Sequence, residues 1–167
     1  NQTGGNDSLL FDGYSFFVDA HGEFRAMAAG FAEDFTIIDT DRDNPVIVPR
    51  ENTVSDIHSA LVMGLRDYVR KCGFKDAVIG LRGGIDSALT AAIAAEALGP
   101  EHVTGITMPS MYSSQGSVDD SATLAQNLGI KLYAVPIIDL YNQFRIALKP
   151  LFAGLPEDVT EENIQAR

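Results

Sequence analysis

The chain has 167 residues, 46% of them hydrophobic, and its 12 basic and 23 acidic residues give a formal net charge of −11 at pH 7. This length allows one domain with a substantial core, or two partial domains. The acidic balance excludes a general nucleic-acid binder, because such proteins need clustered lysine and arginine. No apolar run approaches the roughly 20 residues of a membrane span, and no signal-peptide pattern is visible, so we expect a soluble, cytoplasmic protein.

Strands are predicted in the first forty residues. Residues 13–40 contain three short runs rich in aromatic and β-branched residues, GYSFFVDA, EFRAMAA and DFTIID. His21 and Gly22 separate the first two runs, which predicts a hairpin with a two-residue turn, and the third run predicts a further strand at residues 34–39. Residues 41–50, DRDNPVIVPR, combine charges with two prolines and have no helical period, so they are predicted to form a linker.

The period changes to that of a helix from Thr53 onward. The residues that recur at helical spacing are Ile57, Leu61, Leu65, Tyr68 and Cys72. Thr53 and Asp56 are placed as in a capping box, so an amphipathic helix with the recurring residues on its apolar face is predicted. Cys72 is the single cysteine, which excludes an internal disulfide and a cysteine-rich zinc site. We expect a half-buried structural thiol, and a reactive thiol is the alternative.

Strands and helices alternate through the rest of the chain. The predicted strands are AVIGL at 77–81, VTGITM at 103–108 and IKLYAVPI at 130–137. Helices are predicted at 86–98, around Val118, Ala122, Ala125 and Leu128, and around Leu140, Phe144, Ala147 and Leu148. Strands that alternate with helices of about a dozen residues are typical of the α/β class with a doubly wound parallel sheet.

The turn after AVIGL contains two glycines and leads into a helix. A parallel sheet binds its ligand beyond the carboxyl ends of its strands, where this turn lies. Gly83 and Gly84 lack Cβ atoms, so their backbone N–H groups can come close to a ligand. The helix start offers unpaired N–H groups and a positive dipole end that suit phosphate, and Ser87 adds a hydroxyl donor. Asp86 is either an acid that favours the helix dipole or a Mg²⁺ ligand beside a pyrophosphate.

The sequence RGGIDS, residues 82–87, matches neither the GxGxxG fingerprint nor the Walker P-loop. It resembles the SGGxDS pyrophosphate loop of the N-type ATP pyrophosphatases, which cleave ATP between its α and β phosphates. MPSMYSSQGSVDDSATLAQNLGI at 108–130 and LFAGLPEDVTEENIQAR at 151–167 closely resemble glutamine-dependent NAD⁺ synthetases. The N-terminal NQTGGNDSLLFDGYSFFVDAHGEF is similar to the closing strands of their nitrilase-like glutaminase domain, so the resemblance covers nearly the whole chain in the family's order.

The resemblance implies a fold and a reaction. Residues 51–167 would form the N-terminal part of a synthetase domain with an adenine nucleotide alpha hydrolase-like, Rossmann-like sheet. Residues 1–50 would form the β-rich end of a nitrilase-like α/β sandwich and a linker. Members of this family adenylylate the nicotinate carboxylate of deamido-NAD⁺ with ATP, release pyrophosphate, and let ammonia from glutamine displace AMP. ATP, Mg²⁺, deamido-NAD⁺ and glutamine or ammonia are therefore expected, and a homo-oligomer is expected for the complete enzyme.

The resemblance also implies site residues. The expected ATP contacts are Gly80, Leu81, Arg82, Gly83, Gly84, Ile85, Asp86, Ser87 and Met108, with Asp86 as the metal contact. Pro109 belongs to the segment that lines the nucleotide. Tyr112, Ser113 and Ser114 are expected to line the site or the ammonia route, or to make ordinary turn contacts. Asp119 and Asp120, at the start of the next helix, are expected to be partners of its dipole.

The remaining functional parts are expected outside this sequence. The glutaminase triad of the family, Glu, Lys and Cys, should lie upstream of Asn1, and Cys72 matches none of its members. The deamido-NAD⁺ residues should lie mostly beyond Arg167, so we expect an internal fragment that ends in a helix and is inactive alone. Two alternatives stay open: another N-type ATP pyrophosphatase, similar to a GMP or asparagine synthetase, and a nucleotide-binding remnant without turnover.

Arg82 stands where the family pattern has serine, a residue small enough to donate one hydrogen bond to phosphate. Arginine is longer and always charged. Its side chain could turn to solvent, reach the pyrophosphate as a fork of donors, or fill the phosphate site and damage it. The sequence leaves these three arrangements open.

Overall fold

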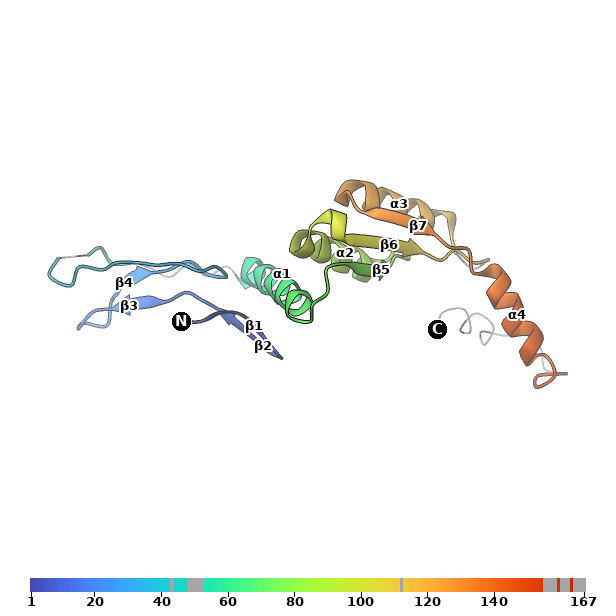
Figure 1. Cartoon of the computed structure of the whole chain (residues 1–167), viewed down its shortest axis with the longest axis horizontal. Helices are drawn as coiled ribbons and strands as arrows, with labels where there is room; N and C mark the ends of the chain where they lie inside the picture. The colour runs from blue at the N-terminus through green and yellow to red at the C-terminus, as the bar shows by residue number, and fades with distance from the viewer. Residues whose placement is uncertain (43, 48–52, 112, 155–158, 160–162, 164–167) are drawn as a thin grey trace. The chain divides into compact units, whose positions relative to one another are not determined.

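The computed structural model of the chain describes residues 1–42, 44–47, 53–111, 113–154, 159 and 163. The chain divides into two compact units: one comprises Asn1–Lys75 and Glu96–Leu98, the other Asp76–Ala95 and Gly99–Arg167. Figure 1 shows the helices and strands of both units in chain order. No helix in the described ranges is long and apolar enough to cross a membrane.

Two antiparallel strand pairs begin the first unit (Figure 1). β1 (Thr3–Asn6) pairs with β2 (Leu9–Asp12), and β3 (Phe16–Val18) pairs with β4 (Phe24–Met27). The pair β3–β4 confirms the predicted hairpin. The hydrophobic pattern does not predict the pair β1–β2, because β1 reads TGGN and has no alternation of apolar and polar residues.

The connection between β3 and β4 is longer than the predicted two-residue turn. It runs from Asp19 to Glu23, and the Asp19 carboxylate accepts hydrogen bonds from the backbone N–H groups of His21 (2.8 Å) and Glu23 (3.0 Å). Arg25 Nε donates to the same carboxylate at 2.6 Å. These donors, the Glu23 N–H foremost, lower the pKa of Asp19 to about 2. The charged side chain of Asp19 therefore stabilises this loop through hydrogen bonds. The pattern of hydrophobic residues cannot predict such bonds.

The predicted third strand is wrong. The side chains of Phe35 and Ile37 are 85% and 83% exposed, and no strand of the described residues pairs with their segment. The Asp34 carboxylate accepts hydrogen bonds from the backbone N–H groups of Ala29 (2.8 Å) and Phe35 (2.7 Å). These two N–H groups are therefore not free to bond a neighbouring strand. The described residues of the predicted linker lie in neither helix nor strand, and the others lie outside the described ranges.

The first helix is predicted correctly but buries a different face. α1 spans Thr53–Lys71, and its buried side chains are Val62 and Met63, at 9% and 3% exposure. The predicted apolar face is largely exposed, with 56% for Ile57, 46% for Leu61 and 64% for Tyr68. The spacing of apolar residues therefore identifies the helix without identifying the side that packs.

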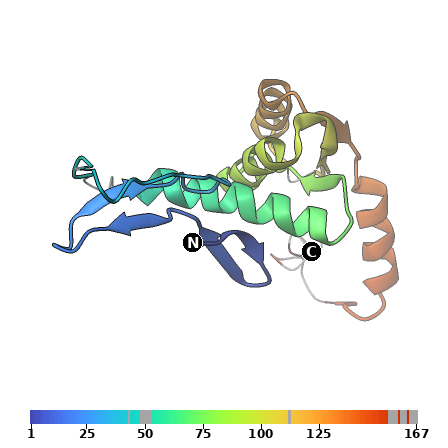
Figure 2. The same cartoon turned by 60° about the vertical axis from the view of Figure 1, so that its left-hand side comes forward.

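The β1–β2 hairpin decides which side of α1 is buried, and Figure 2 shows the hairpin beside the helix. The Gly5 N–H donates to Asp67 Oδ2 at 2.8 Å, and Lys71 Nζ donates to Gly5 O. Thr3 Oγ1 lies 3.7 Å from Met63 Sδ. Because these contacts hold one side of α1 against β1, the apolar face predicted from the sequence is left exposed.

The start of α1 contacts the residue between the two hairpins. The Tyr14 hydroxyl donates to Asp56 Oδ1 at 3.0 Å, and this hydrogen bond to a carboxylate raises the pKa of Tyr14 above its usual value. Thr53 already lies in the helix and the residues just before it lie outside the described ranges, so the capping box stays a prediction. Cys72, after the end of α1, is exposed, so the expectation of a half-buried thiol is wrong.

The second unit contains a parallel sheet (Figure 1). β5 (Ala77–Gly80), β6 (Val103–Thr107) and β7 (Lys131–Ala134) lie in the order β5-β6-β7. α2 (Ile85–Leu98) and a short 3-10 helix, η1 (Pro100–His102), connect β5 to β6; α3 (Gln115–Leu128) connects β6 to β7, and α4 (Ile138–Leu148) follows. These elements confirm the predicted strands and helices of this segment and its parallel α/β class. The further helix expected at the end of the chain lies mostly outside the described ranges.

The core of this unit lies on one face of the sheet. Both connections step in the same direction across the sheet, and because such crossovers are right-handed, α2 and α3 cover the same face. Leu81, Val103 and Thr107 are buried there at 1%, 0% and 5% exposure. A Cβ on Gly105 of the central strand would lie 2.8 Å from Leu81 Cδ1 and 3.1 Å from Leu132 Cδ1. Glycine at this position therefore lets two leucines close the core over β6.

Candidate functional site

The chain leaves β5 at the carboxyl edge of the sheet. The Leu81 N–H donates to Ile106 O at 2.8 Å, which extends the pairing of β5 and β6 beyond Gly80. The Leu81 side chain is buried, so this residue anchors the turn that follows. The backbone then turns through Arg82, Gly83 and Gly84 and enters α2.

Two features of position 83 favour glycine. Its φ is +70°, a left-handed conformation that costs a residue with a side chain about 1–2 kcal/mol. A Cβ at this position would also lie 2.7 Å from Ser117 Cα and 2.9 Å from Ser117 O. The turn therefore lies directly against the backbone of α3.

The start of α2 suits an anion. Gly84 is the N-cap, its φ and ψ are −90° and 153°, and no described side chain caps the helix. A Cβ on Gly84 would meet no atom of the described residues within 4 Å, so among these residues the space in front of the first helical turn is open. Ser87 Oγ donates to Gly84 O at 3.0 Å, so in this structure the hydroxyl bonds the backbone of the turn. The first N–H groups of α2 thus lie together at the positive end of its dipole, as phosphate binding requires.

The residues around the turn are more acidic than basic. Within residues 80–90 and 113–128, Arg82 is the only basic residue, and the acids are Asp86, Asp119 and Asp120. Asp86 is exposed in the first turn of α2, and the described residues include no group of three His, Cys, Asp or Glu that could hold a metal. The donor set therefore fits a Mg²⁺ ion held jointly by a carboxylate and phosphate oxygens, not a cage of protein ligands.

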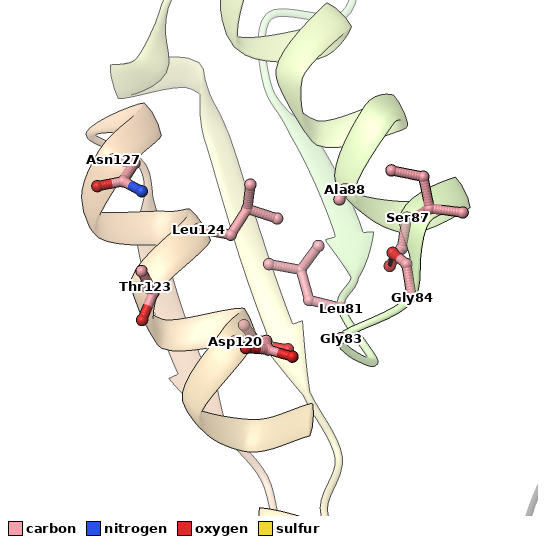
Figure 3. Close-up of a pocket in the computed structure, with 11 residues that line it drawn as sticks. Leu81, Gly83, Gly84, Ser87, Ala88, Asp120, Thr123, Leu124 and Asn127 are labelled. Carbon is pink, nitrogen blue, oxygen red and sulfur yellow. Dashed lines mark hydrogen bonds between the residues drawn. The ribbon is translucent and has the colours of Figure 1, made fainter. Parts of the chain in front are cut away.

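A cavity of about 390 Å³ lies between the glycine turn, α2 and α3 (Figure 3). Leu81, Ala88 and Leu124 supply apolar surface, and polar groups come from both helices. The full lining is Leu81, Gly83, Gly84, Ile85, Ser87, Ala88, Asp120, Ser121, Thr123, Leu124 and Asn127. The α3 residues of this lining fall at helical spacing, so they share the face of α3 that lies toward α2.

The structure brings most of the expected ATP-binding residues together. Leu81, Gly83, Gly84, Ile85 and Ser87 line the cavity, whereas Gly80, Arg82, Asp86 and Met108 do not. Met108 is 45% exposed at the carboxyl end of β6, and a Cβ on Gly80 would lie 3.8 Å from its Cε. The Arg82 side chain is exposed and has no hydrogen bond or ion pair with another described residue. These four residues lie around the turn rather than between the helices.

The loop between β6 and α3 makes turn contacts of its own. Ser113 Oγ accepts the Ser110 N–H at 3.0 Å, and the N-cap Ser114 accepts the Ser117 N–H at 3.1 Å. Pro109 O accepts the Ile137 N–H at 3.2 Å. Pro109, Ser113 and Ser114 are not part of the cavity lining. Tyr112 lies outside the described residues.

The two acids at the start of α3 differ in their surroundings. Asp119 Oδ1 accepts Gln115 Nε2 at 2.9 Å, a contact within the exposed first turns of the helix. Asp120 lines the cavity, together with Thr123 and Asn127, which were not among the residues expected from the sequence. Their helical spacing in the sequence shows that the three residues share one face of α3. It does not show that this face lies toward α2, which only the structure reveals.

The sequence is similar to one family of enzymes and to individual members of it. The model of a family described as NAD synthase matches residues 57–167. A glutamine-dependent NAD(+) synthetase of Synechocystis sp. is 44% identical over the whole chain, which covers 31% of that protein. The chain spans about a third of the length of the curated relatives it matches.

Solved structures are similar as well. The glutamine-dependent NAD⁺ synthetase from Acinetobacter baumannii, in complex with ADP, has a TM-score of 0.90 and 43% identity over 99% of this chain and 32% of that chain. The NMN synthetase from Francisella tularensis has a TM-score of 0.61 and 28% identity over 70% of this chain and 46% of that chain. The similarity to the Acinetobacter protein thus extends over both compact units.

Proposed function

Because the chain belongs to the NAD synthase family, we propose that it carries the ATP-cleaving loop of a glutamine-dependent NAD⁺ synthetase. The proposed reaction is the ATP-dependent amidation of deamido-NAD⁺ through an adenylylated intermediate, with ammonia from glutamine and release of AMP and pyrophosphate. The observation that carries this proposal is the uncapped start of α2 behind Gly83 and Gly84, at the carboxyl end of β5.

The proposal assigns roles to the residues of the turn. The N–H groups between Gly83 and Ser87 hold the β and γ phosphates of ATP, and Gly80 and Met108 lie beside the nucleotide. The solved relative with ADP supports nucleotide binding, and its similarity covers this turn. Preorganised backbone donors stabilise the negative charge that develops on the departing pyrophosphate. A carboxylate accepts ammonia poorly until it carries a good leaving group, which in this reaction is AMP, and this is why adenylylation comes first.

Asp86 is the proposed magnesium contact. Its carboxylate would hold Mg²⁺ together with phosphate oxygens, and the ion would neutralise charge on the leaving pyrophosphate. The segment around the turn has more acids than bases, so a Mg²⁺ ion would offset the repulsion between these carboxylates and the phosphates. The chain's own contribution is to orient the phosphates with N–H groups and to place one carboxylate beside them.

The proposed domain arrangement places the end of a nitrilase-like glutaminase domain at residues 1–50 and a Rossmann-like synthetase domain from residue 51 onward. The family match begins at residue 57, whereas the first compact unit includes α1 and extends to Lys75. α1 thus belongs by sequence to the synthetase family and packs with the N-terminal strands.

The test of the proposed function is ATP–pyrophosphate exchange in a complete synthetase that includes residues 1–167. Exchange that depends on deamido-NAD⁺ and Mg²⁺ is the expected result. Exchange with nicotinic acid mononucleotide instead would indicate the chemistry of the NMN synthetase relative. Exchange with the substrate of a GMP or asparagine synthetase would favour the other N-type ATP pyrophosphatases, and no exchange with any acceptor would indicate a nucleotide-binding remnant.

Arg82→Ser is expected to raise kcat/KM for ATP at least about tenfold, which corresponds to about 1.4 kcal/mol. The Arg82 side chain is exposed and unpaired among the described residues, and the space in front of Gly84 is open. The long cation can therefore lie over the N–H groups that phosphate needs, whereas serine offers one small donor. The measurement is the rate of deamido-NAD⁺-dependent exchange as a function of ATP concentration.

If kcat/KM does not rise in Arg82→Ser, the Arg82 side chain has one of two other arrangements. A lower kcat/KM in Arg82→Ser would make Arg82 a phosphate ligand, because a guanidinium fork suits phosphate geometry. An unchanged kcat/KM would place the side chain in solvent. Arg42→Ser serves as the matched control, because Arg42 is an exposed arginine of the first compact unit.

A further inference from the structure

The first turn of α3 supports the glycine turn from one side. A Cβ on Gly83 would lie 2.7 Å from Ser117 Cα, 2.9 Å from Ser117 O and 3.0 Å from Ser117 Cβ, so the two backbones are in direct contact. At Gly84 the described residues leave the turn open, since a Cβ there would meet none of their atoms within 4 Å. A displacement of Ser117 therefore displaces Gly83 or leaves it without support.

Serine hydroxyl groups contact the N–H, the side chain and the carbonyl oxygen of Ser117. The Ser117 N–H donates to Ser114 Oγ at 3.1 Å, and the two hydroxyl oxygens of these residues lie 2.9 Å apart. Ser117 O accepts a hydrogen bond from Ser121 Oγ at 2.8 Å. Ser121 is 1% exposed, whereas Ser114 is the exposed N-cap of α3. Two side chains of α3 thus fix the backbone against which Gly83 lies.

We infer that Ser114 and Ser121 are positioning residues for adenylylation: acting through Ser117, they hold Gly83 and the N–H groups that follow it where the charge of the pyrophosphate develops. This inference rests on the proposed function. Backbone donors contribute to catalysis only when they are already in place, and a misplacement of about 1 Å can cost roughly a hundredfold in rate. Neither serine needs to touch ATP for this role.

The test uses Ser114→Ala in a complete synthetase that includes residues 1–167. This variant removes the hydroxyl that bonds both the N–H and the Oγ of Ser117. The kcat of deamido-NAD⁺-dependent exchange is expected to fall by about tenfold, while KM for ATP changes less than about twofold, because the rest of the nucleotide site is intact. Ser114→Thr keeps a hydroxyl that can cap the helix and is expected to restore most of the lost kcat.

Two further variants separate positioning from a general loss of stability. Gln115→Ala removes the bond between Gln115 Nε2 and Asp119 Oδ1 from the same helical turn and is expected to leave kcat unchanged. Ser121→Ala removes the side-chain hydrogen bond to Ser117 O and is expected to lower kcat as Ser114→Ala does. Because Ser121 is buried and Ser114 is exposed, at least one of the two substitutions is expected to leave the fold intact.

Three results would overturn the inference: an unchanged kcat in the folded serine variants, an equal loss in Gln115→Ala, or no recovery in Ser114→Thr. A wild-type protein without exchange activity would contradict the proposed function instead. Amide hydrogen exchange of residues 81–87 would then decide the inference. Faster exchange in the serine variants than in the wild type and Gln115→Ala supports it, and equal exchange in all of them contradicts it.

Discussion

Asp86→Ala is expected to reduce deamido-NAD⁺-dependent ATP–pyrophosphate exchange by at least roughly a hundredfold, the loss that removal of one preorganised stabilising group can cause. Asp86 is the one acid in the first turn of α2, and no cluster of ligands among the described residues could hold the magnesium ion in its place. The residual exchange should also need a higher Mg²⁺ concentration for half of its maximum. The measurement is exchange rate against Mg²⁺ concentration at saturating ATP.

The fold should tolerate this substitution. The Asp86 side chain is exposed, so alanine removes only the small favourable effect of an acid near a helix N-terminus. Asp119→Ala is the matched control, because Asp119 is an exposed acid near the start of the neighbouring helix, and its carboxylate bonds only Gln115 among the described residues. It should keep wild-type exchange. Wild-type exchange in Asp86→Ala would remove the proposed metal contact.

Gly83→Ala is expected to lower both stability and activity. The left-handed backbone at φ +70° costs alanine about 1–2 kcal/mol of the free energy of unfolding. The new Cβ would lie 2.7 Å from a backbone carbon of Ser117, and backbone gives way less easily than the end of a flexible side chain. The turn must therefore shift away from α3, and kcat/KM for ATP is expected to fall by at least about a hundredfold. Denaturant unfolding and exchange kinetics measure the two effects.

Gly116→Ala is the control for this substitution. Gly116 neighbours Ser117 in the first turn of α3, and the nearest atom to a Cβ there is Ser114 Oγ at 3.9 Å. Alanine is the better helix former, so this variant should be at least as stable as the wild type and equally active. If Gly83→Ala and Gly116→Ala had the same stability and the same exchange activity, the contact between the turn and α3 would contribute to neither.

The second unit could be predicted almost completely from the sequence because its signals are local. Each strand is a short apolar run, and each helix between strands shows its own periodicity. A glycine pair after a strand and an acid in the next turn indicated a phosphate site for reasons that involve only neighbouring residues. Asp86 and Ser87 were proposed as site residues for these reasons, and the structure places both in the first turn of α2.

The first unit shows where such signals are insufficient. Asp19 and Asp34 bind backbone N–H groups with their carboxylates, so the loop between β3 and β4 is longer than predicted and the segment after Ala29 forms no strand. The apolar stripe of α1 predicted a helix, but hydrogen bonds from the β1–β2 hairpin to Asp67 and Lys71 determined its buried side. A periodicity marks one face of a helix; only a docked partner decides whether that face is covered.

By itself the sequence determined the order of strands and helices in the second unit, the glycine turn with its acid, and the resemblance to NAD⁺ synthetases. Only the tertiary structure decided what supports that turn. Gly83 and Ser117 are distant in the sequence, and they meet because β5 and β6 are adjacent and each is followed at its carboxyl end by one of these segments. The Asp120 side of the cavity arises in the same way. Contacts between distant segments depend on how strands pair, and strand pairing is not a property of any local stretch of residues.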